Sequence, residues 1–222
     1  MALDENRIRI YSDGSCRGNQ KSENLGGFGA ILEFREHKKE VKGGMVNTTN
    51  NVMELLAIIK AFRLIKTDKY SVDVFSDSAY IVNCFSQGWY KKWEKNGFIT
   101  SSKEPVKNVE LWKELVEYNR KFDVKFHKIK GHLDLNAKET ILKKAYAHFL
   151  KDKTNKLYTF DDFMYIACMN NKADALATAA ASELVRHEGF EPPTNRFEVC
   201  DLTRSEERRV GKECRSRWSP YH

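Results

Sequence analysis

The chain of 222 residues contains no apolar run near the ~20 residues that a helix needs to cross a bilayer. Its first seven residues, MALDENR, are too acidic and too polar for a signal peptide. We therefore expect no membrane partner, and a protein that stays in the cytoplasm.

Cysteine pairs at short spacing are also missing. The five cysteines lie far apart along the chain, and none forms a CxxC motif. This spacing argues against a zinc knuckle and against a disulfide framework, so we expect free thiols in a reducing compartment. No internal repeat is present, which excludes a solenoid or other repeat architecture.

Positive charge exceeds negative charge. The 38 lysines and arginines against 31 acids give a formal net charge of +7, which suits a polyanionic partner such as nucleic acid. Residues 185–222 hold eight of the basic residues and seven of the acids, so the preceding part has 30 basic against 24 acidic residues. The excess positive charge therefore belongs to the part of the chain before residue 185.

Residues 185–222 differ from the rest in composition. They show no hydrophobic periodicity, contain Pro192 and Pro193, and are dense in arginine and glutamate. Residues 204–222 resemble the conceptual translation of a sequencing adapter, and residues 189–194 resemble spurious translation across a transfer-RNA gene. We expect a disordered, non-native tail of read-through or adapter-derived sequence. The alternative is a genuine disordered basic arm that binds nucleic acid.

The remaining sequence predicts an α/β fold. Two strands after the first are expected to form an antiparallel meander with it, joined by a charged turn at residues 35–40. Later strands alternate with helices, which predicts a mixed five-stranded sheet, antiparallel meander plus parallel strands, flanked by helices. The expected strands are residues 7–12, 28–34, 41–46, 72–76 and 124–127, and the main expected helices are residues 53–65, 111–118 and 171–184.

Four carboxylates hold similar places in these elements. Asp13 is expected to end the first strand and Asp77 the fourth. Glu54 is expected in the first turn of the first long helix, and Asp174 at the opening of the last. If the first and fourth strands are neighbours, Asp13 and Asp77 lie side by side, and the two helices can close the cluster.

Acids gathered in this way repel one another and raise one another's pKa, unless divalent cations neutralise them. All-oxygen ligands favour Mg²⁺ or Mn²⁺, and two such ions can clamp a scissile phosphate. Each acid alone has a structural explanation: turn chemistry for Asp13, an N-cap for Asp77, the helix dipole for Asp174 and solvation for Glu54. The functional interpretation depends on the four acids together and on their neighbours.

Five blocks of sequence carry those neighbours, in the order YSDGSCRGN (11–19), TTNNVMEL (48–55), FSDS (75–78), KGH (130–132) and NKADALA (171–177). In this order they resemble the signature blocks of type 1 ribonucleases H, over roughly residues 7 to 184. The resemblance implies a ribonuclease H-like fold and a free-standing catalytic domain. It also implies endonucleolytic hydrolysis of the RNA strand of RNA/DNA hybrids, leaving 5′-phosphate and 3′-hydroxyl ends.

The same resemblance implies a role for each matched residue. Asp13 would bridge two Mg²⁺ ions, with Mn²⁺ as a substitute; Glu54 and Asp77 would bind one ion and Asp174 the other. His132 would lie on a mobile loop and assist proton transfer or product release. The alternative for His132 is a structural loop residue.

Substrate contacts are implied as well. Thr49 matches a family residue that binds a phosphate of the DNA strand, and hydroxyl contacts are what distinguish RNA from DNA. Residues 88–108 resemble the basic protrusion, or handle, of the family, in which lysines bind phosphates without sequence specificity. We expect Trp93 to pack against the body and Trp89 to face the DNA strand. The other candidate contacts are Asn19, Asn50, Asn51, Ser78, Lys91, Lys92 and Lys95.

Three departures from the family stand out. Ala79 replaces a frequent glutamine, and Phe98 replaces a frequent tryptophan. The largest departure is an insertion of about residues 134–169 between His132 and Asp174, with expected helices at residues 137–151 and 160–168. This insertion could contact the hybrid, cap the site or pack on the surface.

Three alternatives stay open at this point: a ribonuclease H module of a reverse transcriptase, a catalytically weak hybrid-binding module, and a DNA-cutting member of the wider superfamily. Loss of one acid would favour the second alternative, but all four acids are present. We expect no separate hybrid-binding domain before Arg7, no obligate protein partner, and a monomer.

Overall fold

The computed structural model describes residues 3–17 and 24–187. Five strands form one sheet in the order β3-β2-β1-β4-β5. The pairs β1–β2 and β2–β3 are antiparallel, whereas β1–β4 and β4–β5 are parallel, so the predicted mixed sheet is confirmed. The strands are β1 Ile8–Arg17, β2 Leu25–Phe34, β3 His37–Val46, β4 Val72–Ser76 and β5 Val124–Lys128.

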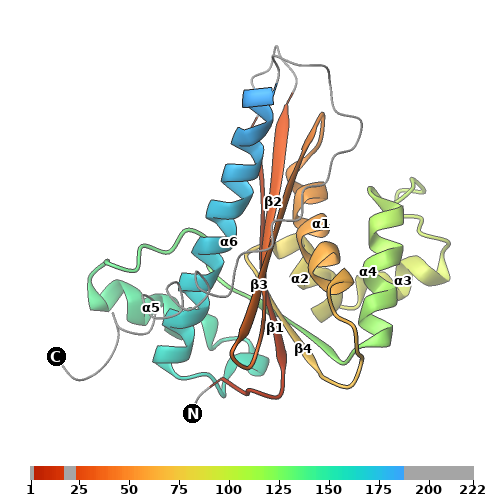
Figure 1. Ribbon diagram of the computed structural model, residues 1–222. Coiled ribbons are helices and arrows are strands. Elements are labelled where there is room, and N and C mark those ends of the chain that lie inside the picture. Colours follow the sequence, from red (N-terminus) through yellow and green to blue (C-terminus); the bar gives the residue numbers. More distant parts are fainter. Residues whose placement is uncertain (1–2, 18–23, 188–222) are drawn as a thin grey trace.

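Helices cover both faces of this sheet (Figure 1). Successive residues of a strand point to opposite faces, so Ile10 enters the core beneath α1, α2 and α4 while Tyr11 enters the core beneath α5 and α6. Val74 and Phe75 of β4 divide in the same way. The helices are α1 Asn50–Arg63, α2 Ala79–Ser86, α3 Trp89–Lys95, α4 Val109–Lys121, α5 Glu139–Phe149 and α6 Phe160–His187, with a short 3-10 helix, η1 Lys153–Asn155.

The meander is longer than the sequence predicts. β1 continues past Asp13 to Arg17, which pairs with Leu25 of β2, so the expectation that Asp13 ends the strand is wrong. The glycine and serine after Asp13 favour a turn, but β2 supplies a complete ladder of partners for them. β2 and β3 are likewise joined only by Arg35 and Glu36, and Arg35 takes the positive φ of 54° that a two-residue hairpin requires.

The two helices expected at residues 160–168 and 171–184 are one helix, α6. The two residues between them, Met169 and Asn170, are buried and include no glycine or proline, so nothing interrupts the backbone ladder. Asp174 therefore lies well inside α6 rather than at its start, which corrects the prediction. Because the helix dipole acts within the first turn, it does not explain the presence of Asp174.

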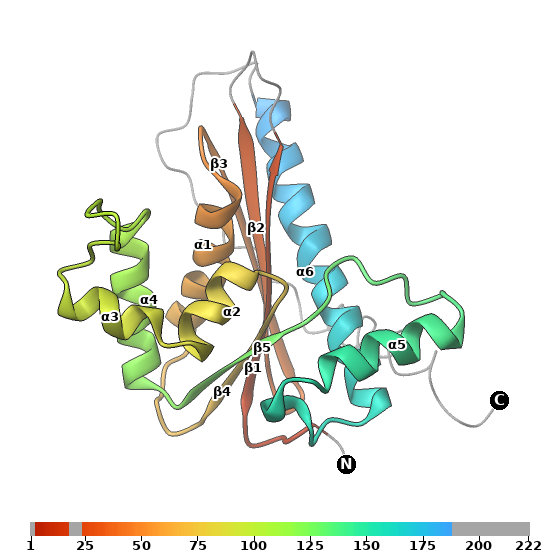
Figure 2. The same cartoon turned by 180° about the vertical axis from the view of Figure 1, so that it is seen from behind.

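The inserted segment, residues 134–169, folds as α5, η1 and the beginning of α6 (Figure 2). Leu142 and Phe149 of α5 and Phe163 of α6 are at most 4% exposed and pack with Tyr11 and Phe75 of the sheet. The insertion thus supplies much of the core on one sheet face.

Cys16 and Cys84 are free thiols, as expected. Cys168 is disulfide-bonded, so the expectation of free thiols is wrong for this residue. Among the described helices, none combines the length and the apolar character that a membrane span requires.

Candidate active site

Two acids of the site come from the parallel pair of strands. The pairing of β1 with β4 ends at Ser12 and Ser76, so Asp13 and Asp77 are the next residues at the same edge. Asp13 is 5% exposed, and oxygens of Asp13, Asp77 and Glu54 lie within 4.8 Å of one another. The expected juxtaposition of Asp13 and Asp77 depends only on where the parallel pairing ends, not on the end of β1.

Glu54 reaches this edge from α1, which begins at Asn50 with Thr49 as its N-cap. A Cβ on Gly14 would lie 2.4 Å from the backbone nitrogen of Glu54, so only glycine allows α1 to approach β1 here. Asn50 Nδ2 donates to Glu54 Oε1 at 2.9 Å. Glu54 Oε2 is buried without a hydrogen-bond partner, which leaves it free to bind a ligand.

Asp174 reaches the cluster from the opposite sheet face. Gly29 of β2 pairs with Asp13, and a Cβ on Gly29 would lie 2.3 Å from the carbonyl oxygen of Ala173. The missing side chain lets α6 lie directly on β2, and the Asp174 carboxyl group is near enough to Asp13 to raise the pKa of Asp13. We call Asp13, Glu54, Asp77 and Asp174 the active-site cluster.

The pKa values of three acids in the cluster are raised, because the cations of the described residues do not balance their burial and mutual repulsion. Burial, together with the charges of Asp77, Glu54 and Asp174, raises the pKa of Asp13 to about 8. Burial raises the pKa of Glu54 to about 7, although the nearby Ser78 hydroxyl and Asn50 amide favour its charged form. Burial also raises the pKa of Asp77. A cation bound among these acids would favour their charged forms.

His132 forms an ion pair with the active-site cluster. Its Nδ1 lies 3.1 Å from Asp174 Oδ2, and its side chain is 71% exposed. The residue has a positive φ of 50°. The preceding Gly131 lies so close to Asp77 that a Cβ would be 1.9 Å from Oδ2, so the loop bearing His132 contacts the cluster directly.

The candidate substrate residues are distributed around this site. Thr49, Asn50 and Asn51 are exposed at the start of α1, although the Thr49 hydroxyl also caps the helix and Asn50 holds Glu54. Ser78 is 6% exposed and lies by Glu54. Asn19 lies outside the described residues.

The handle begins with α3. Trp93 packs edge-to-face on Trp112 with ring centroids 5.2 Å apart, as expected. Trp89 is partly buried, and its indole nitrogen donates to Gln87 Oε1 at 3.2 Å. Lys91, Lys92 and Lys95 are exposed and accessible to phosphates.

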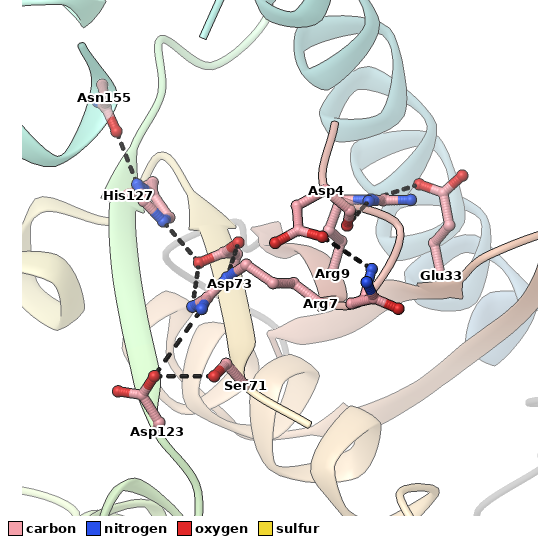
Figure 3. A network of polar contacts seen from close by, with 10 residues as sticks. Asp4, Arg7, Arg9, Glu33, Ser71, Asp73, Asp123, His127 and Asn155 are labelled. Carbon is pink, nitrogen blue, oxygen red and sulfur yellow. Dashed lines mark hydrogen bonds and ion pairs between the residues drawn. The ribbon is translucent and has the colours of Figure 1, made fainter. Parts of the chain in front are cut away.

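A second group of polar and charged side chains, buried or partly buried, lies on the sheet face covered by the insertion (Figure 3). The sequence does not reveal this group. Asp73 of β4 accepts from Arg7 at 2.7 Å and lies 3.1 Å from His127 Nε2. Glu33 of β2 accepts from Arg9 at 3.2 Å. We call Arg7, Arg9, Glu33, Asp73 and His127 the paired cluster. Asn155 of η1 is fully buried and contacts His127 Nδ1 at 2.6 Å, which joins the insertion to the paired cluster.

The sheet order and the acidic edge define an α/β protein with a carboxylate cluster of a kind that could hold a metal ion. The family model described as RNase H matches residues 5–141, more than half of the chain. The chain belongs to the RNase H family.

Individual relatives agree with this assignment. Over 128 residues the chain is 48% identical to a ribonuclease H of Clostridium botulinum, which covers 58% of this chain and 85% of the relative. The solved structure of LC9-RNase H1, described as a type 1 RNase H with the type 2 active-site motif, is similar with a TM-score of 0.59 at 25% identity, over 82% of this chain and 75% of that chain. LC11-RNase H1, solved in complex with an RNA/DNA hybrid, shares the fold with a TM-score of 0.50 at 21% identity, over 81% of this chain and 99% of that chain.

The family match contains three of the four acids and His132 but ends before Asp174. The place of Asp174 therefore depends on its contacts with Asp13 and His132.

Proposed function

We propose that this protein is a ribonuclease H, an endonuclease that hydrolyses the RNA strand of RNA/DNA hybrids and leaves 5′-phosphate and 3′-hydroxyl ends. The observation that carries the proposal is the active-site cluster, in which the buried Asp13 and Glu54 meet the partly buried Asp77 and Asp174 without a matching set of cations among the described residues. The family match and the ribonuclease H relatives support the same activity.

Divalent cations fit the cluster. Its donors are all oxygens, which suits Mg²⁺, with Mn²⁺ as a substitute, and the orphaned Glu54 Oε2 offers a free ligand atom. Asp13 lies close to Glu54 and Asp77 and interacts electrostatically with Asp174, so it would help to hold both ions. Glu54 and Asp77 would then bind one ion, and Asp174 the other. When bound, the ions supply water activation and stabilisation of the leaving 3′ oxygen.

The other residues act around these ligands. Asn50 orients the Glu54 carboxylate through its hydrogen bond to Oε1. His132, held by Asp174 and exposed to solvent, is placed to move a proton during cleavage or product release. Thr49, Asn51 and Ser78 lie at or beside the start of α1 or by Glu54 and would contact sugar and phosphate groups, and Asn19 is proposed for the same role from the sequence alone.

The handle is proposed to bind the hybrid through Trp89 and through Lys91, Lys92 and Lys95. Replacing the three lysines by alanine should weaken hybrid binding and reduce the salt slope of log K by about 0.9 for each phosphate that the lysines no longer neutralise. The matched control is Lys66→Ala with Lys69→Ala, since these exposed lysines precede β4, at the opposite end of that strand from Asp77. An unchanged salt slope in the handle variant would contradict its role in binding.

We further propose that residues 7–184 form one catalytic domain, with the handle at about residues 88–108 and the insertion at about residues 134–169. The enzyme would act in the cytoplasm as a monomer without an obligate protein partner. Residues 185–222 are proposed to be non-native sequence.

Cleavage of a labelled RNA/DNA hybrid tests the function directly. Single-stranded RNA, duplex RNA and duplex DNA serve as controls, and wild type is compared with Asp13→Asn in Mg²⁺, in Mn²⁺ and in EDTA. Cleavage of the hybrid alone, dependent on the cation and on Asp13, is the expected result. Tight hybrid binding without cleavage in either cation would instead identify a binding module, and cleavage of duplex DNA would identify a DNA-cutting enzyme.

A further inference from the structure

We propose that Asn171 is a positioning residue for His132. It acts by binding Leu133 at the start of the insertion, a place that we call the neck of the insertion. This inference rests on the proposed ribonuclease activity. Asn171 Nδ2 donates to the carbonyl oxygen of Leu133 at 2.8 Å, across 38 positions of the sequence. Leu133 directly follows His132, and the insertion begins with the next residue.

The geometry of the loop creates a need for such a restraint. His132 has a φ of 50°, a left-handed conformation that is unfavourable for a residue with a side chain. Its own side chain is largely exposed, so packing does not hold the ring in place. A rotation of the backbone to negative φ would carry the imidazole away from the cluster. The conformation must therefore be stabilised by contacts on either side of it.

α6 supplies those contacts from one face. Asn171 and Asp174 are three positions apart, so their side chains lie on the same side of the helix. Asp174 contacts the His132 ring at Nδ1, and Asn171 binds the carbonyl oxygen of Leu133, the next residue. Together they restrain the side chain of His132 and the backbone that follows it relative to the carboxylates.

The insertion makes this hydrogen bond necessary. After Leu133 the chain leaves the site for α5 and η1 before α6 returns it (Figure 2). The long excursion cannot by itself restrict the His132 loop as a short connection would. The buried Leu133 side chain anchors the neck on one side, and Asn171 binds its carbonyl on the other. The remaining Asn171 oxygen, Oδ1, is buried without a hydrogen-bond partner, so the Leu133 carbonyl is the group that orients this amide.

A double-mutant cycle tests the proposal. Asn171→Ala should lower kcat on the hybrid about ten-fold, as for partners that orient catalytic ligands, and leave KM unchanged. In a His132→Ala background, Asn171→Ala should cause no further loss, because its effect passes through the imidazole. Ser182→Ala is the matched control, since it removes another α6 hydrogen bond from side chain to backbone, 2.8 Å to Thr178, without touching the loop. If the alanine variant does not fold, the nearly isosteric Asn171→Leu replaces it.

Amide hydrogen exchange provides a readout that does not require activity. Exchange in residues 129–137 should be about five-fold faster in Asn171→Ala than in wild type, and unchanged in Ser182→Ala. Equal losses of kcat with and without His132, an unchanged kcat, or unchanged exchange would each overturn the proposal. If wild type does not cleave the hybrid, the proposed function fails, and the exchange comparison alone decides the role of Asn171.

Discussion

The active-site cluster and the paired cluster place buried acids in the same sheet but balance their charges differently. Asp73 lies within β4 and Asp77 directly follows that strand. Burial alone would raise the pKa of Asp73, but hydrogen bonds and charges from His127 and Arg7 hold it below its ordinary value. Burial raises the pKa of Asp77, and the charge of His132 only partly opposes this effect. Burial raises the pKa of both acids, but only at Asp73 do the neighbouring groups outweigh it.

This difference in charge compensation distinguishes the paired cluster, which we assign to stability, from the active-site cluster, which we assign to function. A buried carboxylate needs a compensating charge, and the fold provides Arg7 and His127 for Asp73. For Asp13, Glu54 and Asp77 it provides no such set of cations within the described residues, which leaves the compensation to ligands from solution. Replacing members of each cluster should therefore affect different properties of the protein.

The largest effect is expected for Asp77→Asn. Loss of a proposed metal ligand should lower kcat/KM more than about 100-fold. Replacing a residue that only hydrogen-bonds to a metal ligand already lowers metal affinity or activity by about 10–100-fold. Stability in EDTA should stay equal or rise, since the substitution removes like-charge repulsion. Hybrid-cleavage kinetics and chemical denaturation of the same preparation measure both. A loss of stability in parallel with activity would assign Asp77 to the structural group.

Asp73→Asn should show the reverse behaviour. It leaves Arg7 and His127 without their buried partner, so the free energy of unfolding should fall by about 3 kcal/mol. At temperatures where the variant is folded, kcat/KM should be unchanged. Asp123→Asn is the matched control: Asp123 also lies near Arg7, at 3.8 Å, but its side chain is 70% exposed, so at most about 1 kcal/mol should be lost. Equal losses in the two variants would contradict the contribution assigned to burial.

The active-site cluster was largely predictable from the sequence, but the paired cluster was not. Asp13 and Asp77 carry a signal in the residues next to them, and Asp77 directly follows its predicted strand. Glu33, Asp73 and His127 appear in the sequence as polar residues of half-exposed strands. Their burial depends on the insertion, whose docking on the sheet involves Asn155, and no local pattern encodes that contact. The same long-range packing decides that α6 is continuous.

The two clusters should also respond to pH in opposite directions. In the folded, metal-free protein the pKa of Asp13 is about 8, far above its ordinary value, so the folded state retains a proton that the unfolded chain releases. This contribution to stability is present at acidic pH and is lost as pH rises towards about 8. Asp73 has a lowered pKa, so its contribution is present at neutral pH and is lost as pH falls below its ordinary value.

Denaturation in EDTA between about pH 5 and pH 8 measures this difference. Relative to wild type, Asp13→Asn should remove at least about 1 kcal/mol of the stability lost over this range. Added Mg²⁺ should stabilise wild type most at the upper end of the range, where the acids are charged, and the variant less. Identical pH profiles for wild type and variant in EDTA would show that Asp13 is not held uncharged by the fold.

The smallest effect is expected at Lys38, which lies beside the paired cluster and is one of several partners of Glu33. Lys38 Nζ lies 3.5 Å from Glu33 Oε1 and donates to the Tyr165 hydroxyl at 2.6 Å. After Lys38→Met, Glu33 keeps Arg9 and the hydroxyl of Tyr11 at 3.0 Å, so about 1 kcal/mol of stability should be lost, measured by urea denaturation. Lys143→Met, which breaks an exposed pair on α5, should leave the stability almost unchanged. A loss near that expected for Asp73→Asn would mean that compensation of Glu33 is not shared, and that each buried acid depends on a single cation.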